Sequence, residues 1–160
     1  VMTGRTPYQG RFLGTSVNDK EAVSRAFSLT KANRLKDKKF AVLSGGEKQK
    51  IVIARSVAQT TPWMLLDEPI ASLDIKNQIE IMQTLLELNR QEGVSVLMVL
   101  HDINLAGIYC DRLIMLKDGQ VIAAGNTNEC LCEENLKKLY DISFFHMDTK
   151  KGQRYYYAEI

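Results

Sequence analysis

Two acidic residues at the end of an apolar run are the first feature able to do chemistry. The stretch WMLLDEP, residues 63–69, ends in Asp67 and Glu68 and is stopped by Pro69. A short apolar run of this kind predicts a buried strand, and open α/β sheets bind ligands at the carboxyl ends of their strands. One carboxylate there can hold Mg²⁺ through water, and the other can polarise an attacking water. An acidic surface turn is an equally good interpretation of the dipeptide alone.

The stretch LSGGEKQ, residues 43–49, is a second candidate. Ser44 and Glu47 have the spacing of a capping box, in which the two side chains satisfy amides at a helix start. That interpretation leaves Gly45 and Gly46 unexplained, because glycine weakens a first helical turn. Amides without side chains at the positive end of a helix form an anion site with room for a phosphate. The stretch therefore predicts a helix that begins at a phosphate.

Two further residues, His101 and Asp74, indicate a function only in combination with the other motifs. His101 directly follows the apolar run 94–100, a second predicted strand, although a lone histidine at a strand end is most often structural. If the two predicted strands are parallel neighbours, His101 and Glu68 emerge at the same sheet edge, where histidine can bond a phosphate oxygen. Asp74, at the end of ASLD, is by itself an ordinary helix N-cap.

The elements that must position these residues alternate along the chain. Apolar periodicity predicts helices within 16–35 (capped by Asn18 or Asp19), 44–59, 73–93, 103–110 and 127–140, strands within 61–69 and 94–100, and hairpins over 112–125 and 142–160. The hairpin turns are predicted at Asp118-Gly119 and near Lys151-Gly152. Residues 1–15 predict a loop or a broken helix start. Alternating strands and helices indicate an α/β fold with a parallel sheet.

The composition is that of an ordinary globular domain, with 45% hydrophobic and 25% charged residues. A formal net charge of +2 argues against nucleic acid as a partner, because such binding requires a basic face. No apolar run reaches the ~20 residues of a membrane-spanning helix. The three cysteines lack metal-site spacing and predict reduced thiols.

Taken together, LSGGEKQ, WMLLDEP, ASLD and VLMVLHD resemble the ATP-binding-cassette ATPases in order and approximate separation, from the first residues to near Gly125. The resemblance implies a P-loop NTPase-like α/β domain, with a parallel sheet, flanking helices and a helical subdomain. It implies three parts: the helical signature subdomain and its following helix over 1–59, the second half of the ATPase core over 60–126, and a C-terminal helix and hairpin over 127–160.

The resemblance also implies a role for each motif residue. Ser44 and Gly46 would touch the γ-phosphate of a nucleotide held by a partner subunit. Asp67 would organise Mg²⁺ through water, Glu68 would be the general base, and His101 would reach the γ-phosphate. The resemblance implies that the nucleotide is contacted by the signature motif and by the loop that crosses the dimer interface. The implied contact residues are Leu43, Ser44, Gly45, Gly46, Glu47, Gln49 and Asp74.

Three longer phrases look like the ATPases of iron-chelate (siderophore, haem) and cobalamin importers: VMTGRTPY, LDIKNQIEIM and HDINLAGIYCDRLIMLKDGQVIAAG. This narrower resemblance implies ATP and Mg²⁺ as cofactors. It implies a second ATPase subunit and membrane permease subunits as partners, the permease docking around Gly4 to Gly14, and a solute-binding protein as an indirect partner. The implied location is the cytoplasmic face of the inner membrane, as a peripheral subunit.

One expected motif is missing from these residues. No glycine in the 160 residues is followed by lysine, so the phosphate loop G-x-x-x-x-G-K-[ST] is absent. We therefore expect a domain truncated at its N-terminus, with poor MgATP binding by itself and an exposed sheet edge through which it self-associates. Two alternatives remain open: an ABC-type ATPase that moves no solute, and a catalytically silent interaction module.

Overall fold

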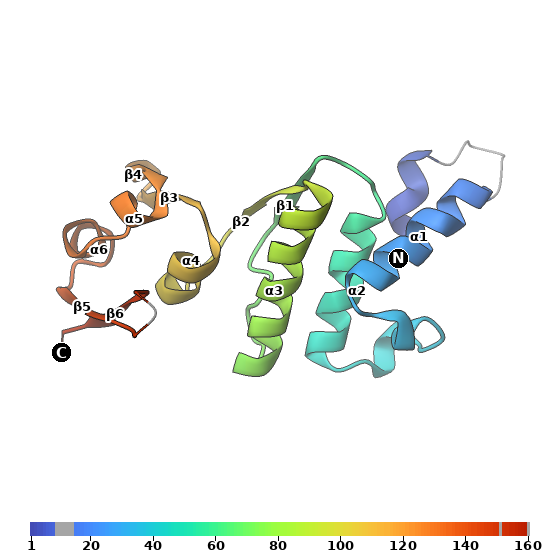
Figure 1. The fold of residues 1–160 in the computed structure, drawn as a ribbon, viewed down its shortest axis with the longest axis horizontal. Coiled ribbons are helices and arrows are strands. Elements are labelled where there is room, and N and C mark those ends of the chain that lie inside the picture. The colour runs from blue at the N-terminus through green and yellow to red at the C-terminus, as the bar shows by residue number, and fades with distance from the viewer. Residues whose placement is uncertain (9–14, 151, 160) are drawn as a thin grey trace. The chain divides into compact units, whose positions relative to one another are not determined.

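The computed structural model describes residues 1–8, 15–150 and 152–159. The chain divides into two compact units, Val1–Val99 and Leu100–Ile160 (Figure 1). The three-part division expected from the sequence stays a prediction.

Helices dominate the first unit. They are α1 (Val17–Leu29), α2 (Gly45–Val57) and α3 (Ile75–Glu92), accompanied by the 3₁₀ helices η1 (Met2–Tyr8), η2 (Asn33–Leu35) and η3 (Phe40–Val42). The predicted starts of α2 and α3 are confirmed, and the C-cap of α3 is Gly93, whose φ of 67° suits glycine. Ile53 of α2 and Ile81 of α3 are fully buried. The apolar faces that the periodicity indicated therefore form the core of this unit.

Three predictions about residues 1–35 differ in detail from the structure. The N-cap is Ser16, which forms a capping box with Asp19, because the serine hydroxyl can accept the Asp19 N–H from an extended backbone. The helix ends at Leu29 instead of continuing to 35, since Lys31 takes a left-handed backbone conformation with a φ of 54°. The opening residues form η1, a 3₁₀ helix, where a loop or a broken helix start was expected.

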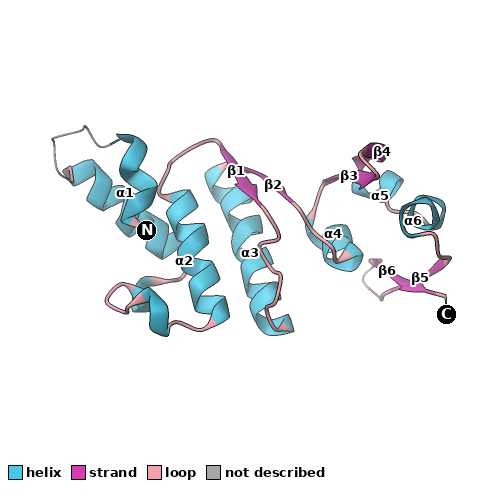
Figure 2. Cartoon of the chain, turned by 180° about the vertical axis from the view of Figure 1, so that it is seen from behind, coloured by secondary structure: helices cyan, strands magenta, loops and turns pink. Residues whose placement is uncertain are grey.

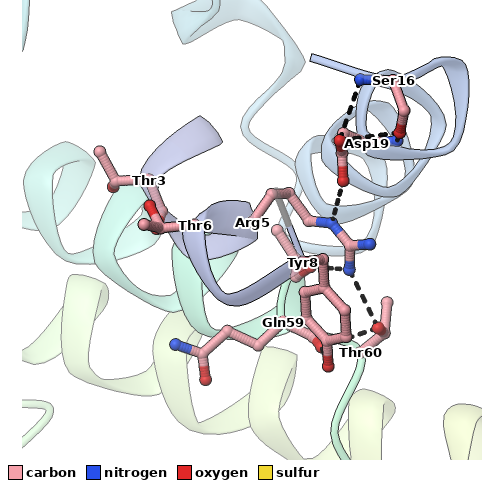
Figure 3. Close-up of polar contacts among 9 residues, drawn as sticks. Thr3, Arg5, Thr6, Tyr8, Ser16, Asp19, Gln59 and Thr60 are labelled. Carbon is pink, nitrogen blue, oxygen red and sulfur yellow. Dashed lines mark hydrogen bonds and ion pairs between the residues drawn. The ribbon is translucent and has the colours of Figure 1, made fainter. Parts of the chain in front are cut away.

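Residues 4–8 of η1 contact the C-terminal end of α2 (Figure 3). Buried Arg5 pairs with Asp19 at 2.9 Å, and its Nη1 donates to the Ala58 carbonyl at 3.0 Å. Tyr8 lies under the Arg5 guanidinium, 4.0 Å from ring centroid to Cζ, and donates its hydroxyl to the Gln59 carbonyl at 2.6 Å. The Arg5 guanidinium holds the pKa of the Asp19 carboxyl below its ordinary value. Arg5 and Tyr8 thus satisfy carbonyls that a helix C-terminus leaves without partners.

Strands β1 (Trp63–Leu66) and β2 (Ser95–Met98) pair in parallel, with Leu66 opposite Met98 (Figure 2). Both predicted strands are confirmed, and they are parallel neighbours. Their predicted burial is wrong for one face, because the described residues leave it uncovered. Alternation along the strands places on that face Trp63, Leu65, Leu97 and Val99, all at least half exposed.

The described residues of the second unit, 100–150 and 152–159, form three short helices and two hairpins. The elements are α4 (Ile103–Tyr109), β3 (Arg112–Lys117), β4 (Gln120–Asn126), α5 (Thr127–Cys130), α6 (Glu133–Tyr140), β5 (Phe144–Asp148) and β6 (Arg154–Ala158). The turn at Asp118-Gly119 is confirmed by φ values of 51° and 76°. Strands β5 and β6 confirm the second hairpin, while Lys151 of its predicted turn lies outside the described residues.

The helix predicted over 127–140 is interrupted between α5 and α6. Leu131 is buried, and its carbonyl accepts a hydrogen bond from the Tyr156 hydroxyl. Asn135 donates its side-chain amide to the Cys130 carbonyl at 2.8 Å. These contacts satisfy carbonyls that a continuous helix would otherwise use, so tertiary packing overrides the local pattern.

The three cysteines are free thiols, and burial raises the pKa of Cys110 to about 11.

Within the part of the chain that the structure describes, none of the helices has the length and apolar character needed to cross a membrane.

Candidate functional site

The signature turn, residues 43–47, opens α2 with the predicted capping box. The Ser44 hydroxyl accepts the Glu47 N–H at 3.3 Å, and the Glu47 carboxylate accepts the Ser44 N–H at 3.0 Å. The Ser44 N–H bond lowers the pKa of Glu47, and Lys38, 3.4 Å away, acts in the same direction. Both partners of the box are therefore held in one geometry.

The turn leaves two amides in front of the first intrahelical bond. The helix ladder begins where the Lys48 N–H donates to the Ser44 carbonyl at 2.8 Å. The N–H groups of Gly45 and Gly46 precede that bond, and first-turn amides have no carbonyl four residues earlier in the helix. Leu43 anchors the turn in the core, being only 5% exposed. This donor set fits a phosphate oxygen at the positive end of α2.

Asp74 caps α3, as its position after ASL suggested. Its Oδ1 accepts the Asn77 backbone N–H at 2.9 Å, and its Oδ2 accepts the Asn77 side-chain amide at 2.8 Å. The Asn77 backbone bond is the main reason that the pKa of Asp74 lies below its ordinary value. The loop of residues 71–74 is thus tied to the first turn of α3.

The starts of α2 and α3 lie against one another. A Cβ on Gly46 would come within 2.2 Å of the Asn77 Oδ1 atom. One turn further along, the Lys50 ammonium contacts the Glu80 carboxylate at 2.6 Å. The structure therefore brings together the signature turn and the Asp74 loop. Sequence reasoning missed Asn77, because only the contact with Gly46 distinguishes it from other polar residues in a first helical turn.

The acidic pair follows β1 directly. Asp67 and Glu68 are exposed, whereas Pro69 and Ile70 behind them are buried. Glu68 has a φ of 45°, and its carbonyl accepts the Ala71 N–H at 3.1 Å. A non-glycine residue in this region carries backbone strain of about 1–3 kcal/mol, and such residues gather at functional sites. The carboxylates at the end of β1 are oxygen ligands of the kind that Mg²⁺ prefers.

His101 belongs to the second unit, where it precedes the N-cap of α4. Asp102 accepts the Asn104 and Leu105 N–H groups at 2.9 Å each. The predicted approach of His101 to Glu68 spans both units and stays a prediction.

In the described part of the Gly4–Gly14 stretch predicted to meet a permease, Gly4 and Arg5 are buried and residues 6–8 are exposed, and the permease contact stays a prediction. Gly4 is buried, and a Cβ there would lie 2.2 Å from the Arg55 carbonyl oxygen. Residues 9–14 lie outside the described residues.

Comparison with known proteins agrees with these motifs. Residues 3–71, which include the signature turn and the acidic pair, match the family model described as ABC transporter. The Escherichia coli (strain K12) ferric enterobactin transport ATP-binding protein FepC is 39% identical over 148 residues, which cover 92% of this chain and 55% of FepC. The chain belongs to the ABC transporter ATPase family.

Solved structures of ABC transporters share the fold. A metal-chelate type ABC transporter in an inward-facing conformation matches with a TM-score of 0.93 and 25% identity, over 99% of this chain and 65% of that one. The dimeric bacterial cassette MJ0796 matches with a TM-score of 0.61 and 34% identity, over 75% of this chain and 51% of that one. The chain spans about half the length of its relative FepC and of the MJ0796 chain.

Proposed function

We propose that the complete protein is the ATP-hydrolysing subunit of an importer for an iron chelate or a similar metal-containing solute. The observation that carries the proposal is the start of α2, where the Ser44 hydroxyl and the N–H groups of Gly45 and Gly46 precede the first intrahelical bond and can donate to an anion. The relatives favour this substrate class, since FepC is named for ferric enterobactin transport and the solved neighbour is of metal-chelate type.

The roles of the site residues follow from their chemistry. The Ser44 hydroxyl and the Gly46 N–H donate to the γ-phosphate of a nucleotide held by the partner subunit. The Glu68 carboxylate takes a proton from the attacking water, and His101 donates to the γ-phosphate. Asp67 holds Mg²⁺ through water. When bound, MgATP supplies the phosphoanhydride bond that is cleaved.

The partners are a second copy of the ATPase, arranged head to tail, and membrane permease subunits that place the protein at the cytoplasmic face of the inner membrane. A solute-binding protein outside the cytoplasm acts indirectly. The dimeric MJ0796 cassette supports the pairing. The exposed apolar face of β1 and β2 supports a longer ATPase core, because parallel sheets are normally covered on both faces. Without that cover, the chain alone is expected to self-associate.

Uptake in cells tests the substrate class. A strain that lacks the whole reading frame is expected to lose uptake of a ferric siderophore, and the wild-type gene to restore it. A Glu68→Gln gene, expressed to the same level, is expected not to restore it. Normal uptake in the deleted strain, with ATP hydrolysis by the purified protein, would favour an ATPase that moves no solute. No hydrolysis at all would favour a silent interaction module.

The 160-residue chain by itself is expected to bind MgATP poorly. It contains no glycine followed by lysine, so the amides and lysine of a phosphate loop are missing. Titration calorimetry of the purified chain with MgATP should show no saturable heat, whereas the complete protein should show it. Tight saturable binding by the chain alone would contradict this expectation.

A further inference from the structure

We propose that Asn77 is a positioning residue that holds the interface loop, residues 71–74, and the signature turn, residues 43–47, as one unit. The inference rests on the proposed function, in which both segments face the partner subunit and its nucleotide. When the signature turn moves onto that nucleotide, Asn77 transmits the movement to Asp74 of the same subunit.

Asn77 occupies both oxygens of the Asp74 carboxylate. Its backbone N–H donates to Oδ1 at 2.9 Å, and its side-chain amide donates to Oδ2 at 2.8 Å. An ordinary N-cap needs only the backbone bond. The second bond fixes the rotation of the carboxylate, and with it the end of the interface loop.

The other side of the same amide lies against Gly46. A Cβ on Gly46 would be 2.2 Å from Oδ1, 2.4 Å from Cγ and 3.0 Å from Nδ2 of Asn77. Gly46 is buried, so the signature turn has no open space into which it could move away from Asn77. A Cβ on the neighbouring Gly45 would meet only the Leu73 side chain, at an ordinary 3.5 Å. Asn77 is therefore the close contact between the two segments.

The two helix starts cannot separate easily. Lys50 and Glu80 follow Gly46 and Asn77 on the same helix faces and pair at 2.6 Å, with the Lys50 side chain only 13% exposed. Further along, Ile53 and Ile81 are fully buried. The helices thus hold the Asn77 amide between Gly46 and Asp74.

Two variants on the same helix separate positioning from general stability. Asn77→Ala removes the side-chain bond to Asp74 but keeps the backbone bond that caps α3. Gln83→Ala removes an exposed amide of similar size from α3 and serves as the matched control.

Amide hydrogen exchange of the complete protein without nucleotide tests the positioning itself. Exchange at the backbone amides of residues 71–74 is expected to be about 2- to 10-fold faster in Asn77→Ala than in Gln83→Ala, the effect of one lost hydrogen bond. Exchange in the middle of α3 should stay the same in both variants. Equal exchange at 71–74 would overturn the proposal.

Dimer formation tests the consequence at the nucleotide. In a Glu68→Gln background, in which bound ATP persists, the MgATP concentration for half-maximal dimer is measured by light scattering after size exclusion. Asn77→Ala is expected to raise that concentration about 3- to 10-fold and Gln83→Ala to leave it unchanged. Equal values for both variants would overturn the inference alone. A Glu68→Gln parent that forms no dimer with MgATP would overturn the proposed function, and the inference with it.

Discussion

Glu68→Gln in the complete protein is expected to lower the turnover number for ATP by about 10²- to 10⁴-fold, the range that a general base contributes. Glutamine has nearly the same shape as glutamate, but its amide cannot accept the proton of the attacking water. The measurement is steady-state phosphate release at saturating MgATP.

Several controls make the Glu68 result specific. The thermal unfolding midpoint of Glu68→Gln should match that of the wild type, because glutamine tolerates the φ of 45° no better and no worse than glutamate. MgATP binding should persist in the variant. Unchanged turnover would remove Glu68 from the role of general base.

Gly46→Asp is expected to lower turnover by about 10²- to 10³-fold, the scale of losing one preorganised donor at a site of developing charge. Its Cβ would overlap the Asn77 amide, 2.2 Å away, and its carboxylate would add negative charge where a phosphate is proposed to bind. Overpacking of this kind also costs about 1–3 kcal/mol of folding stability. Phosphate release and thermal unfolding measure the two effects.

Two glycine-to-alanine variants separate sterics from charge in the signature turn. Gly46→Ala introduces the overlap with Asn77 without a charge, so its unfolding midpoint should fall. Gly45→Ala meets only Leu73 at 3.5 Å, so its midpoint should stay close to that of the wild type. Equal midpoints for the two alanine variants would contradict the close packing of Gly46.

The local features of the site were predictable from the sequence because they depend on near neighbours. The capping box of Ser44 and Glu47 and the turn at Asp118-Gly119 both involve residues within one turn of chain. The parallel pairing of β1 and β2 followed from alternating strands and helices.

Features that depend on distant residues were not predictable. The contact between Gly46 and Asn77 joins two helices, and nothing in either local pattern indicates it. The break at Leu131 depends on the hydroxyl of Tyr156, which lies on β6, beyond α6 and β5. The apolar pattern of β1 indicated burial on both sides, but the exposure of Trp63 depends on what covers the sheet.

Mixing two inactive variants of the complete protein tests the central claim most directly, namely that each signature turn completes the site of the partner subunit. Gly46→Asp and Glu68→Gln are mixed in equal amounts, allowed to exchange subunits, and assayed for phosphate release. A mixed dimer pairs the intact Glu68 of one subunit with the intact signature turn of the other. Random pairing then restores roughly a quarter of the wild-type sites if the dimer is head to tail. A mixture no more active than either variant alone would contradict the account.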